Sequence, residues 1–172
     1  ARVFDFGNGK NNNNIHLNRQ GTGSALDFAL YTGTGSYTGF IHDGAITNGQ
    51  FTHLVATVTS SNVMKLYQDG VLIGTDSTDV TAPTVMTRAN HYLGRSNWNV
   101  DKMFKGYMKY FRVWQGHELT QAEVSHLYSK RNNRLVKTQG ACPDGWRWIA
   151  KKCFRFFPES INWIESESKC VG

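Results

Sequence analysis

The chain is poor in the features that define several classes of protein. It has three prolines and three cysteines among 172 residues, and no apolar run approaches the ~18 residues that a membrane span needs. Charged residues make up 19% and hydrophobic residues 40%, a balance typical of a globular protein rather than a disordered one. No signal peptide is visible, because the opening residues, ARVFDF, already have the pattern of a strand. We therefore expect an ordered protein with no membrane insertion in this segment and with any export signal upstream of it.

The sequence also lacks the short motifs of common catalytic sites. It contains no GxSxG nucleophile elbow, no HExxH metal motif and no phosphate-binding P-loop. The histidines show no spacing that would place two of them on one metal ion; they are His16, His42, His53, His91, His117 and His126. These absences favour a protein that is not an enzyme.

Acidic residues are scarce in one part of the chain. The formal net charge is +6, and residues 130–155 hold eight Lys or Arg but only one acid. Residues 1–129, with ten basic and nine acidic side chains, are close to neutral. Arg147, Lys151 and Arg155 alternate with aromatic residues, which is a faint version of a nucleic-acid-binding surface. A solvated linker followed by an exposed hairpin is the favoured alternative, so we expect no nucleic-acid partner.

Short apolar runs separated by Gly, Asn, Ser and Thr dominate the first part of the chain. Runs with the length and composition of strands cover residues 2–6, 14–17, 25–32, 37–42, 51–60, 91–95 and 105–115. Between the first two runs, GNGKNNNN is predicted to be a loop, because Asn tolerates left-handed backbone. The run at 105–115 is apolar on both faces, so we expect that strand to be covered on both sides or bent. Many short strands with frequent turns predict a mainly β fold, an antiparallel β-sandwich of the jelly-roll kind.

Two local signals are sharper. In MKLYQDGVLIGT, Asp69 and Gly70 supply the positive φ angles of a tight hairpin turn, which makes Asp69 a turn residue before a metal ligand. LTQAEVSHLYSKR (119–131) is predicted to be a helix, because Thr120 and Glu123 form a capping box ahead of an apolar stripe. We expect this single late helix to pack on one end of the sandwich.

Five motifs occur in the same order as in a known family. They are RVFDFGNG, FTHLVATV, MKLYQDGVLIG, YLGRSNW and FKGYMKYFRVWQGHELTQAEV. Together they resemble the laminin-G-like, concanavalin-A-like jelly-roll modules of secreted and surface proteins, over residues 1–131. The family usually has an extra strand pair before RVFDFGNG, so the resemblance implies that the chain starts inside a domain. Glycosidases with a jelly-roll fold carry an E-x-D-x-(x)-E run of acids, which this chain lacks.

The last part of the chain is similar to a different family. After a basic linker at 132–141, residues 142–172 resemble the opening of a long-form C-type lectin-like domain, with CPDGW…CF and then W-I-x-x-x-x-x-C. The resemblance implies that Cys142 and Cys153 close a hairpin and that Cys170 pairs with a cysteine outside the chain, because the domain is truncated. A disulfide in so short a segment contributes roughly 3 kcal/mol. A zinc site or a catalytic thiol is disfavoured, because no CxxC or HxxxH pair and no evident histidine partner is present.

Candidate metal ligands are few. Asp5, Asn8 and Asp101 are the weak candidates for calcium, although turn-forming roles are favoured for Asn and Asp at such positions. We also expect a structural pair between Asp5 and Arg95, because both charges lie within apolar strand motifs.

Trp98 is the candidate for ligand contact. It lies between Asn97 and Asn99 in an expected loop, where an exposed indole is a platform for a sugar ring or for a partner's apolar surface. The equally weighted alternative places the ring under its own loop.

These expectations describe two extracellular or cell-surface modules in tandem. The predicted function is non-catalytic recognition or adhesion through glycans or extracellular proteins, with calcium as the cofactor to test. One alternative is a structural subunit that self-associates into an extracellular assembly. Another is an accessory module of a larger secreted hydrolase.

Overall fold

The computed structural model describes residues 1–132, 147–149 and 152–154. The chain divides into two compact units, Ala1–Asn132 and Asn133–Gly172. In the second unit, β9 (Arg147–Ile149) and β10 (Lys152–Phe154) pair antiparallel. Two antiparallel strands therefore lie where the sequence predicts a hairpin.

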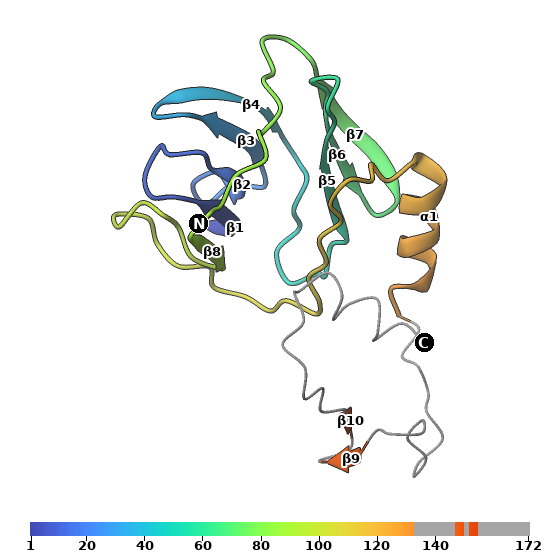
Figure 1. Ribbon diagram of the computed structural model, residues 1–172. Helices are drawn as coiled ribbons and strands as arrows, with labels where there is room; N and C mark the ends of the chain where they lie inside the picture. The colour runs from blue at the N-terminus through green and yellow to red at the C-terminus, as the bar shows by residue number, and fades with distance from the viewer. Residues whose placement is uncertain (133–146, 150–151, 155–172) are drawn as a thin grey trace. The chain divides into compact units, whose positions relative to one another are not determined.

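The first unit contains two antiparallel sheets (Figure 1). The larger sheet has the order β4-β3-β2-β1-β8. Its strands are β1 (Arg2–Gly7), β2 (Ile15–Arg19), β3 (Leu26–Thr32), β4 (Ser36–His42) and β8 (Asn90–Leu93). The smaller sheet has the order β5-β6-β7, made of β5 (Leu54–Val58), β6 (Met64–Gln68) and β7 (Val71–Asp76).

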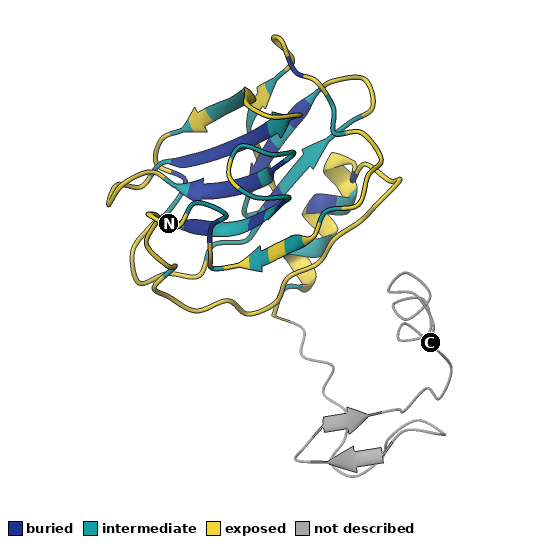
Figure 2. Ribbon diagram, turned by 60° about the vertical axis from the view of Figure 1, so that its left-hand side comes forward, coloured by how far each residue is buried: buried dark blue, intermediate teal, exposed yellow. Residues whose placement is uncertain are grey.

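The main core lies between the two sheets. Residues at alternate positions of β2 and β3 belong to this core, and β6 supplies residues from the smaller sheet. Figure 2 shows the strands that carry the buried residues. The fully buried members include Leu17, Leu26, Phe28, Leu30, Met64 and Leu66. This alternation is what strands with one buried face require, and it makes the unit a β-sandwich.

Helix α1 (Gln121–Lys130) covers the other face of the smaller sheet (Figure 1). Val124 and Leu119 pack there with Val55 of β5 and Tyr67 of β6. The predicted capping box is formed, since Thr120 and Glu123 bind each other's backbone N–H groups. The late helix and its N-terminal signal are confirmed.

The β6–β7 turn anchors the helix. Asp69 and Gly70 have φ angles of 50° and 87°, as the tight hairpin requires. The Gly70 carbonyl accepts hydrogen bonds from Gln121 Nε2 at 2.6 Å and Ser125 Oγ at 3.1 Å. A local turn signal therefore also positions an element fifty residues away in the chain.

The prediction of a strand at 105–115 is wrong. The described backbone from Lys102 to Thr120 contains no strand, and the large apolar side chains between residues 107 and 114 are exposed, with Tyr107 at 86%. A strand-forming sequence needs a partner ladder, and here the segment runs between β8 and α1 without one. Phe111 still packs its ring against Phe4 and Phe6 of β1, with centroid separations of 5.6 and 5.7 Å.

Candidate functional site

The face of the larger sheet that points away from the core is polar. In β2, His16 and Asn18 alternate with the core residue Leu17. The pairing register aligns Asp5 with His16, and Asn18 with Asp27. We call the following set the polar face: Arg2, Asp5, Asn14, His16, Asn18, Asp27, Tyr31 and Tyr37.

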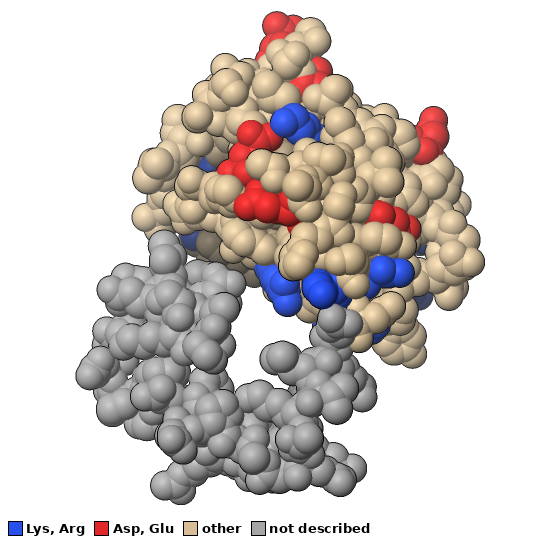
Figure 3. Space-filling model, turned by 90° about the vertical axis from the view of Figure 1, so that its right-hand side faces the viewer, with Lys and Arg blue, Asp and Glu red and all other residues tan. Residues whose placement is uncertain are grey.

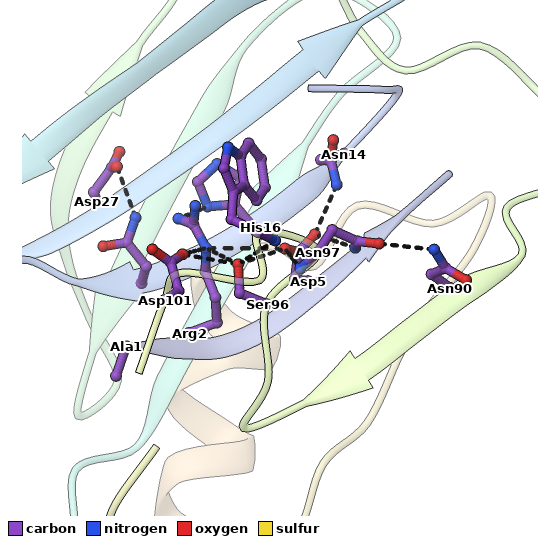
Figure 4. A network of polar contacts seen from close by, with 12 residues as sticks. Ala1, Arg2, Asp5, Asn14, His16, Asp27, Asn90, Ser96, Asn97 and Asp101 are labelled. Atoms are coloured by element: carbon purple, nitrogen blue, oxygen red, sulfur yellow. Dashed lines mark hydrogen bonds and ion pairs between the residues drawn. The ribbon is translucent and has the colours of Figure 1, made fainter. Parts of the chain in front are cut away.

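Asp5 of β1 is the centre of the polar face and is completely buried (Figure 4). Its carboxylate accepts hydrogen bonds from Asn14 Nδ2 at 2.9 Å and from the Asn97 backbone N and Nδ2 at 2.8 and 2.9 Å. Gly7 makes room for this arrangement, because a Cβ there would lie 2.3 Å from Asn14 Nδ2. The buried charge therefore ties the loop after β8 to the sheet.

Arg2 links Asp5 to a second carboxylate. Its Nε lies 3.8 Å from Asp5 Oδ2 and 3.4 Å from Asp101 Oδ2. Ser96 Oγ donates to Asp101 Oδ2 at 2.8 Å. The Arg2 guanidinium therefore pairs with two carboxylates. Arg2 and Asp5 are both buried, and buried charges need such partners.

His16 stacks beneath the aromatic side chains of this face. Its Nδ1 accepts a hydrogen bond from Arg2, and its buried Nε2 has no partner among the described residues. Burial, reinforced by the charge of Arg2, lowers the pKa of His16 from 6.5 to about 3. The imidazole is therefore neutral at physiological pH, with its Nε2–H left as a free donor.

A row of three aromatic rings borders the polar face. Tyr31 lies 5.4 Å from Tyr37 and 5.3 Å from Trp98, measured between ring centroids. Trp98 also lies over the Arg2 guanidinium, 4.6 Å from its Cζ. Tyr37 is 49% exposed, and the other two rings are half-buried. Trp98 therefore packs onto the sheet and is partly exposed.

Asp27 lies beside this row. It accepts hydrogen bonds from Asn18 Nδ2 at 2.8 Å, Gln20 Nε2 at 3.1 Å and Tyr37 Oη at 3.1 Å. Burial raises the pKa of the Asp27 carboxyl, and these hydrogen bonds partly oppose the rise. Burial and the adjacent Asp27 charge also raise the pKa of Tyr37. The result is a neutral phenol that donates to a desolvated acceptor.

The expected pair between Asp5 and Arg95 is not formed. Arg95 is exposed and places its guanidinium over the ring of Tyr92, 4.7 Å from the centroid. Asp5 does carry a buried ion pair, but its cation is Arg2, three residues earlier in the same strand. A bulge in the β1–β2 register near Arg2 accompanies this contact.

The three calcium candidates make other polar contacts within the described residues. The oxygens of Asp5 are filled by hydrogen-bond donors, and Arg2 lies against both Asp5 and Asp101. Asn8 instead bonds the backbone of Thr87 and Ala89. Within the described part of the chain, no group of three or more His, Cys, Asp or Glu side chains is placed to hold a metal ion.

The residues flanking Trp98 differ in their roles. Asn97 is committed to structure, because its side chain donates to Asp5 and accepts from Asn90 Nδ2 at 2.9 Å. Asn99 is exposed. The predicted pairing of Cys142 with Cys153 and that of Cys170 stay predictions, because Cys142 and Cys170 lie outside the described residues.

The first unit matches a known family. The laminin G family model, described as the concanavalin A-like lectin/glucanases superfamily, matches residues 1–125. The chain belongs to this superfamily. The jelly-roll prediction for a concanavalin A-like domain is thereby confirmed together with its two sheets.

Short stretches of this concanavalin A-like chain are also similar to C-type lectin-like receptors. One is the oxidized low-density lipoprotein receptor 1 of Oryctolagus cuniculus, 35% identical over 55 residues, covering 30% of this chain and 20% of the receptor. Another is C-type lectin domain family 1 member A of Mus musculus, 35% identical over 46 residues, covering 27% and 16%. A third is the NKG2-D type II integral membrane protein of Homo sapiens, 42% identical over 33 residues, covering 19% and 15%. The chain spans a fifth or less of the length of these relatives.

A solved structure gives a weaker likeness. It is an S-layer domain-containing protein (residues 221–444) from Clostridium thermocellum, 21% identical, with a TM-score of 0.40 over 74% of this chain and 62% of that one. Among the described residues, no helix has the length and apolar character needed to cross a membrane.

Sequence reasoning missed most of the polar face of this concanavalin A-like domain. A signal for it was present, because Asn14, His16 and Asn18 alternate with apolar residues along one strand. In LDFALYT, Asp27 and Tyr31 share the same alternation. Reading both faces of each strand, and not the apolar face alone, would have found them.

Proposed function

We propose that the concanavalin A-like unit is a non-catalytic recognition module that binds carbohydrate on its polar face. The row formed by Tyr31, Tyr37 and Trp98 beside Asp27 carries this proposal. Sugars offer apolar ring faces that stack on aromatic side chains and hydroxyl groups that bond to fixed polar groups. The half-exposed Tyr37 supplies the accessible ring, and its hydroxyl is already oriented by Asp27.

Two features of the site favour binding over hydrolysis. The nearby carboxylates are Asp27, Asp5 and Asp101. Asp27 is buried and already accepts three hydrogen bonds, and Asp5 has no accessible surface and so cannot reach a substrate. Asp5 and Asp101 are also both ion-paired with the Arg2 guanidinium. Hydrolysis by the usual acid–base pair needs one protonated and one ionised carboxyl group facing the sugar.

A glycan array probed with the whole chain, with and without a chelator, tests the proposal. Tyr37→Ala should weaken binding to any glycan hit by about tenfold, equivalent to about 1.4 kcal/mol. Tyr37→Phe keeps the ring and removes the hydroxyl, so it separates stacking from hydrogen bonding. Loss of binding with chelator would show that binding requires calcium.

Tyr107→Ala is the matched control. Tyr107 is a tyrosine of the same chain, 86% exposed and outside the polar face. Equal effects of the two alanine variants, or an array without any glycan hit, would contradict the proposal.

A second candidate function is self-association into an extracellular assembly. It is favoured by the exposed apolar side chains of residues 100–114, among which Val100 is 90% exposed and Met103 67%. Sedimentation velocity over a wide range of protein concentration checks this. Tyr107→Ser should abolish a concentration-dependent oligomer, whereas Tyr37→Ser should leave it intact.

The same proposal includes the location of the protein. Carbohydrate recognition, together with similarity to receptors of the C-type lectin-like class, supports a place outside the cell or at its surface. Detection of the protein in a surface or medium fraction of its native source checks this, and recovery only from the cytosol would contradict it.

A further inference from the structure

The loop that connects β7 to β8 is rich in hydroxyl side chains. We call residues 77–89 the crossing loop, and five of them are Ser or Thr: Ser77, Thr78, Thr81, Thr84 and Thr87. All five are exposed. Among the described residues, the bonds that hold these positions of the loop use backbone groups and none uses one of the five hydroxyl groups. These hydroxyl groups are therefore open to solvent and to a modifying enzyme.

The crossing loop is fixed to the sandwich on both sides of its middle. Val80 is buried in the main core, and the N–H of Ala82 donates to Asn62 Oδ1 at 2.9 Å. Further along, Asn8 Nδ2 donates to the Thr87 carbonyl at 3.1 Å. The segment between these contacts is therefore displayed on the surface of a folded unit, where an enzyme can reach it.

Pro83 gives the middle of the crossing loop a preference for extended backbone. Its ring fixes φ, and it disfavours helical backbone at the preceding residue, Ala82. The structure has neither helix nor strand in the crossing loop. An extended chain of the polyproline II kind repeats every three residues, which is the spacing of Thr81 and Thr84. This geometry places the two threonines on the same side of the chain.

Two exposed apolar side chains follow Thr84. Val85 is 98% exposed, and Met86 beside it is exposed as well. A single exposed apolar residue is common, but two in succession next to a proline form a small apolar patch. A bulky, hydrated group attached at Thr84 would cover this patch and keep it from contact with other proteins.

The charges around the crossing loop disfavour phosphate as the attached group. Asp76 and Asp79 flank Thr78 in the sequence and would repel it. Arg88, the cation of the loop, donates its Nε to the Asn13 carbonyl at 2.8 Å. Figure 3 shows Asp and Glu side chains at the top of the first unit, the end where the crossing loop begins in Figure 1. A neutral group meets no such repulsion.

From this we infer that Thr81 and Thr84 are sites of O-glycosylation, at which a neutral sugar is joined to the threonine oxygen. Exposed Ser and Thr clustered with Pro are the composition of O-glycosylated segments. The chain contains no Asn-x-Ser/Thr sequence, so the corresponding attachment to an asparagine amide has no acceptor here. The assignment rests on the extracellular location proposed above, because such sugars are attached to proteins that pass to the cell surface.

The chemistry is transfer of a glycosyl group from a nucleotide-activated sugar. The Oγ atom of the threonine attacks the anomeric carbon, and a new carbon–oxygen bond forms there. The bond from that carbon to the diphosphate breaks, and the nucleoside diphosphate leaves with its electron pair. The hydroxyl proton passes to a base of the transferase, so the threonine is neither oxidised nor reduced.

Mass spectrometry of the whole chain from its native source tests the assignment. Trypsin cleaves after Lys65 and Arg88, so both threonines lie on one peptide, residues 66–88. We expect this peptide to carry hexose or N-acetylhexosamine masses that alkaline β-elimination removes and that fragmentation assigns to Thr81 or Thr84. An unmodified peptide, or one that carries phosphate instead, would overturn the assignment.

The Thr81→Val/Thr84→Val double variant, secreted by cultured eukaryotic cells, should lose the sugar from this peptide. Valine keeps the shape of threonine and lacks the hydroxyl group, so the exposed loop keeps its fold. The matched control is the Thr47→Val/Ser60→Ala double variant, which removes two exposed hydroxyl groups from other loops and should leave the sugar in place. Sugar that persists in the first variant, or that is lost equally from both, would contradict the choice of Thr81 and Thr84.

The glycan array separates this modification from the proposed function. The chain made in bacteria carries no such sugar, and Thr81 and Thr84 lie outside the polar face, so it should bind array glycans as the secreted chain does. A chain that binds a glycan but is not glycosylated in its native source contradicts the modification alone. A glycosylated chain that binds no glycan contradicts the polar face alone.

Discussion

Asp5 is a buried carboxylate that joins β1 to the loop after β8 through hydrogen bonds from Asn97. Asp5→Asn keeps the shape of the side chain but removes its charge and sets an amide N–H₂ against donors from Asn14 and Asn97. Loss of one member of a buried ionic network costs about 3 kcal/mol, so we expect a drop of that size in the free energy of unfolding. Urea unfolding followed by tryptophan fluorescence measures it.

The exposed Asp43 provides the comparison for that variant. Asp43→Asn should change stability by less than about 0.5 kcal/mol. Similar small effects of the two substitutions would show that the loop after β8 does not depend on Asp5.

His16 gives the protein a pH-dependent stability. The unfolded chain takes up a proton at His16 near pH 6.5, whereas the folded chain does so only near pH 3. The contribution of His16 is therefore complete above pH 6.5 and declines as the pH falls toward 3, by up to about 1.4 kcal/mol per unit. The raised pKa of Asp27 works in the opposite sense, because it favours the folded state at low pH and loses this effect as the pH rises. Urea unfolding between these pH limits should show a smaller slope for His16→Gln, and identical slopes would exclude the role of His16.

Residue-level prediction from the sequence succeeded only where the partner was close in the chain. Thr120 and Glu123 are three residues apart, so their mutual capping is readable from spacing. The ion pair between Arg2 and Asp5 could not be predicted from the sequence, because residues three apart in a regular strand lie on opposite faces. A bulge near Arg2 changes the register and brings the two side chains together. Long-range donors such as Asn97 leave no local signal.

At the scale of elements, the β6–β7 turn and α1 are held together by hydrogen bonds to the Gly70 carbonyl. Gly70→Ala adds strain at a φ of 87° and places a Cβ 3.1 Å from Tyr128, so it should lower stability by about 2 kcal/mol. Gly44→Ala meets a similar φ of 77° with no atom within 4 Å and should cost about 1 kcal/mol. The difference, measured by thermal unfolding of both variants, reports the contact with the helix, and equal losses would show that the contact is unimportant.

Elements with a complete local pattern were predicted well, and the failure at 105–115 has a physical cause. The hairpin carries its own turn residues, and each of its strands has the other as a partner. The segment 105–115 has strand-forming residues but no hydrogen-bonded partner among the described strands. Its β-propensity alone therefore does not make it a strand. Prediction from composition cannot supply the neighbour that a strand requires.

At the scale of the whole molecule, the first unit contains both of its cores. The clusters between the sheets and beneath α1 use residues from Val3 to Leu127 only. A chain ending at Asn132 should therefore fold cooperatively, with a urea midpoint for its β-sheet signal equal to that of the full chain. Its circular dichroism and unfolding curve check this, and failure to fold would show dependence on residues 133–172.

The pairing of β1 with β8 has a consequence for the order of events during synthesis. Strand β1 is made early, but its neighbour β8 follows much later, and Asn97, which donates to Asp5, lies 92 residues after it. Until Leu93 and Asn97 have left the ribosome, the polar groups along that edge of β1 face water or other chains. The nascent sheet is an open template over this period, and slow translation between β2 and β8 lengthens its exposure to mispairing with another copy.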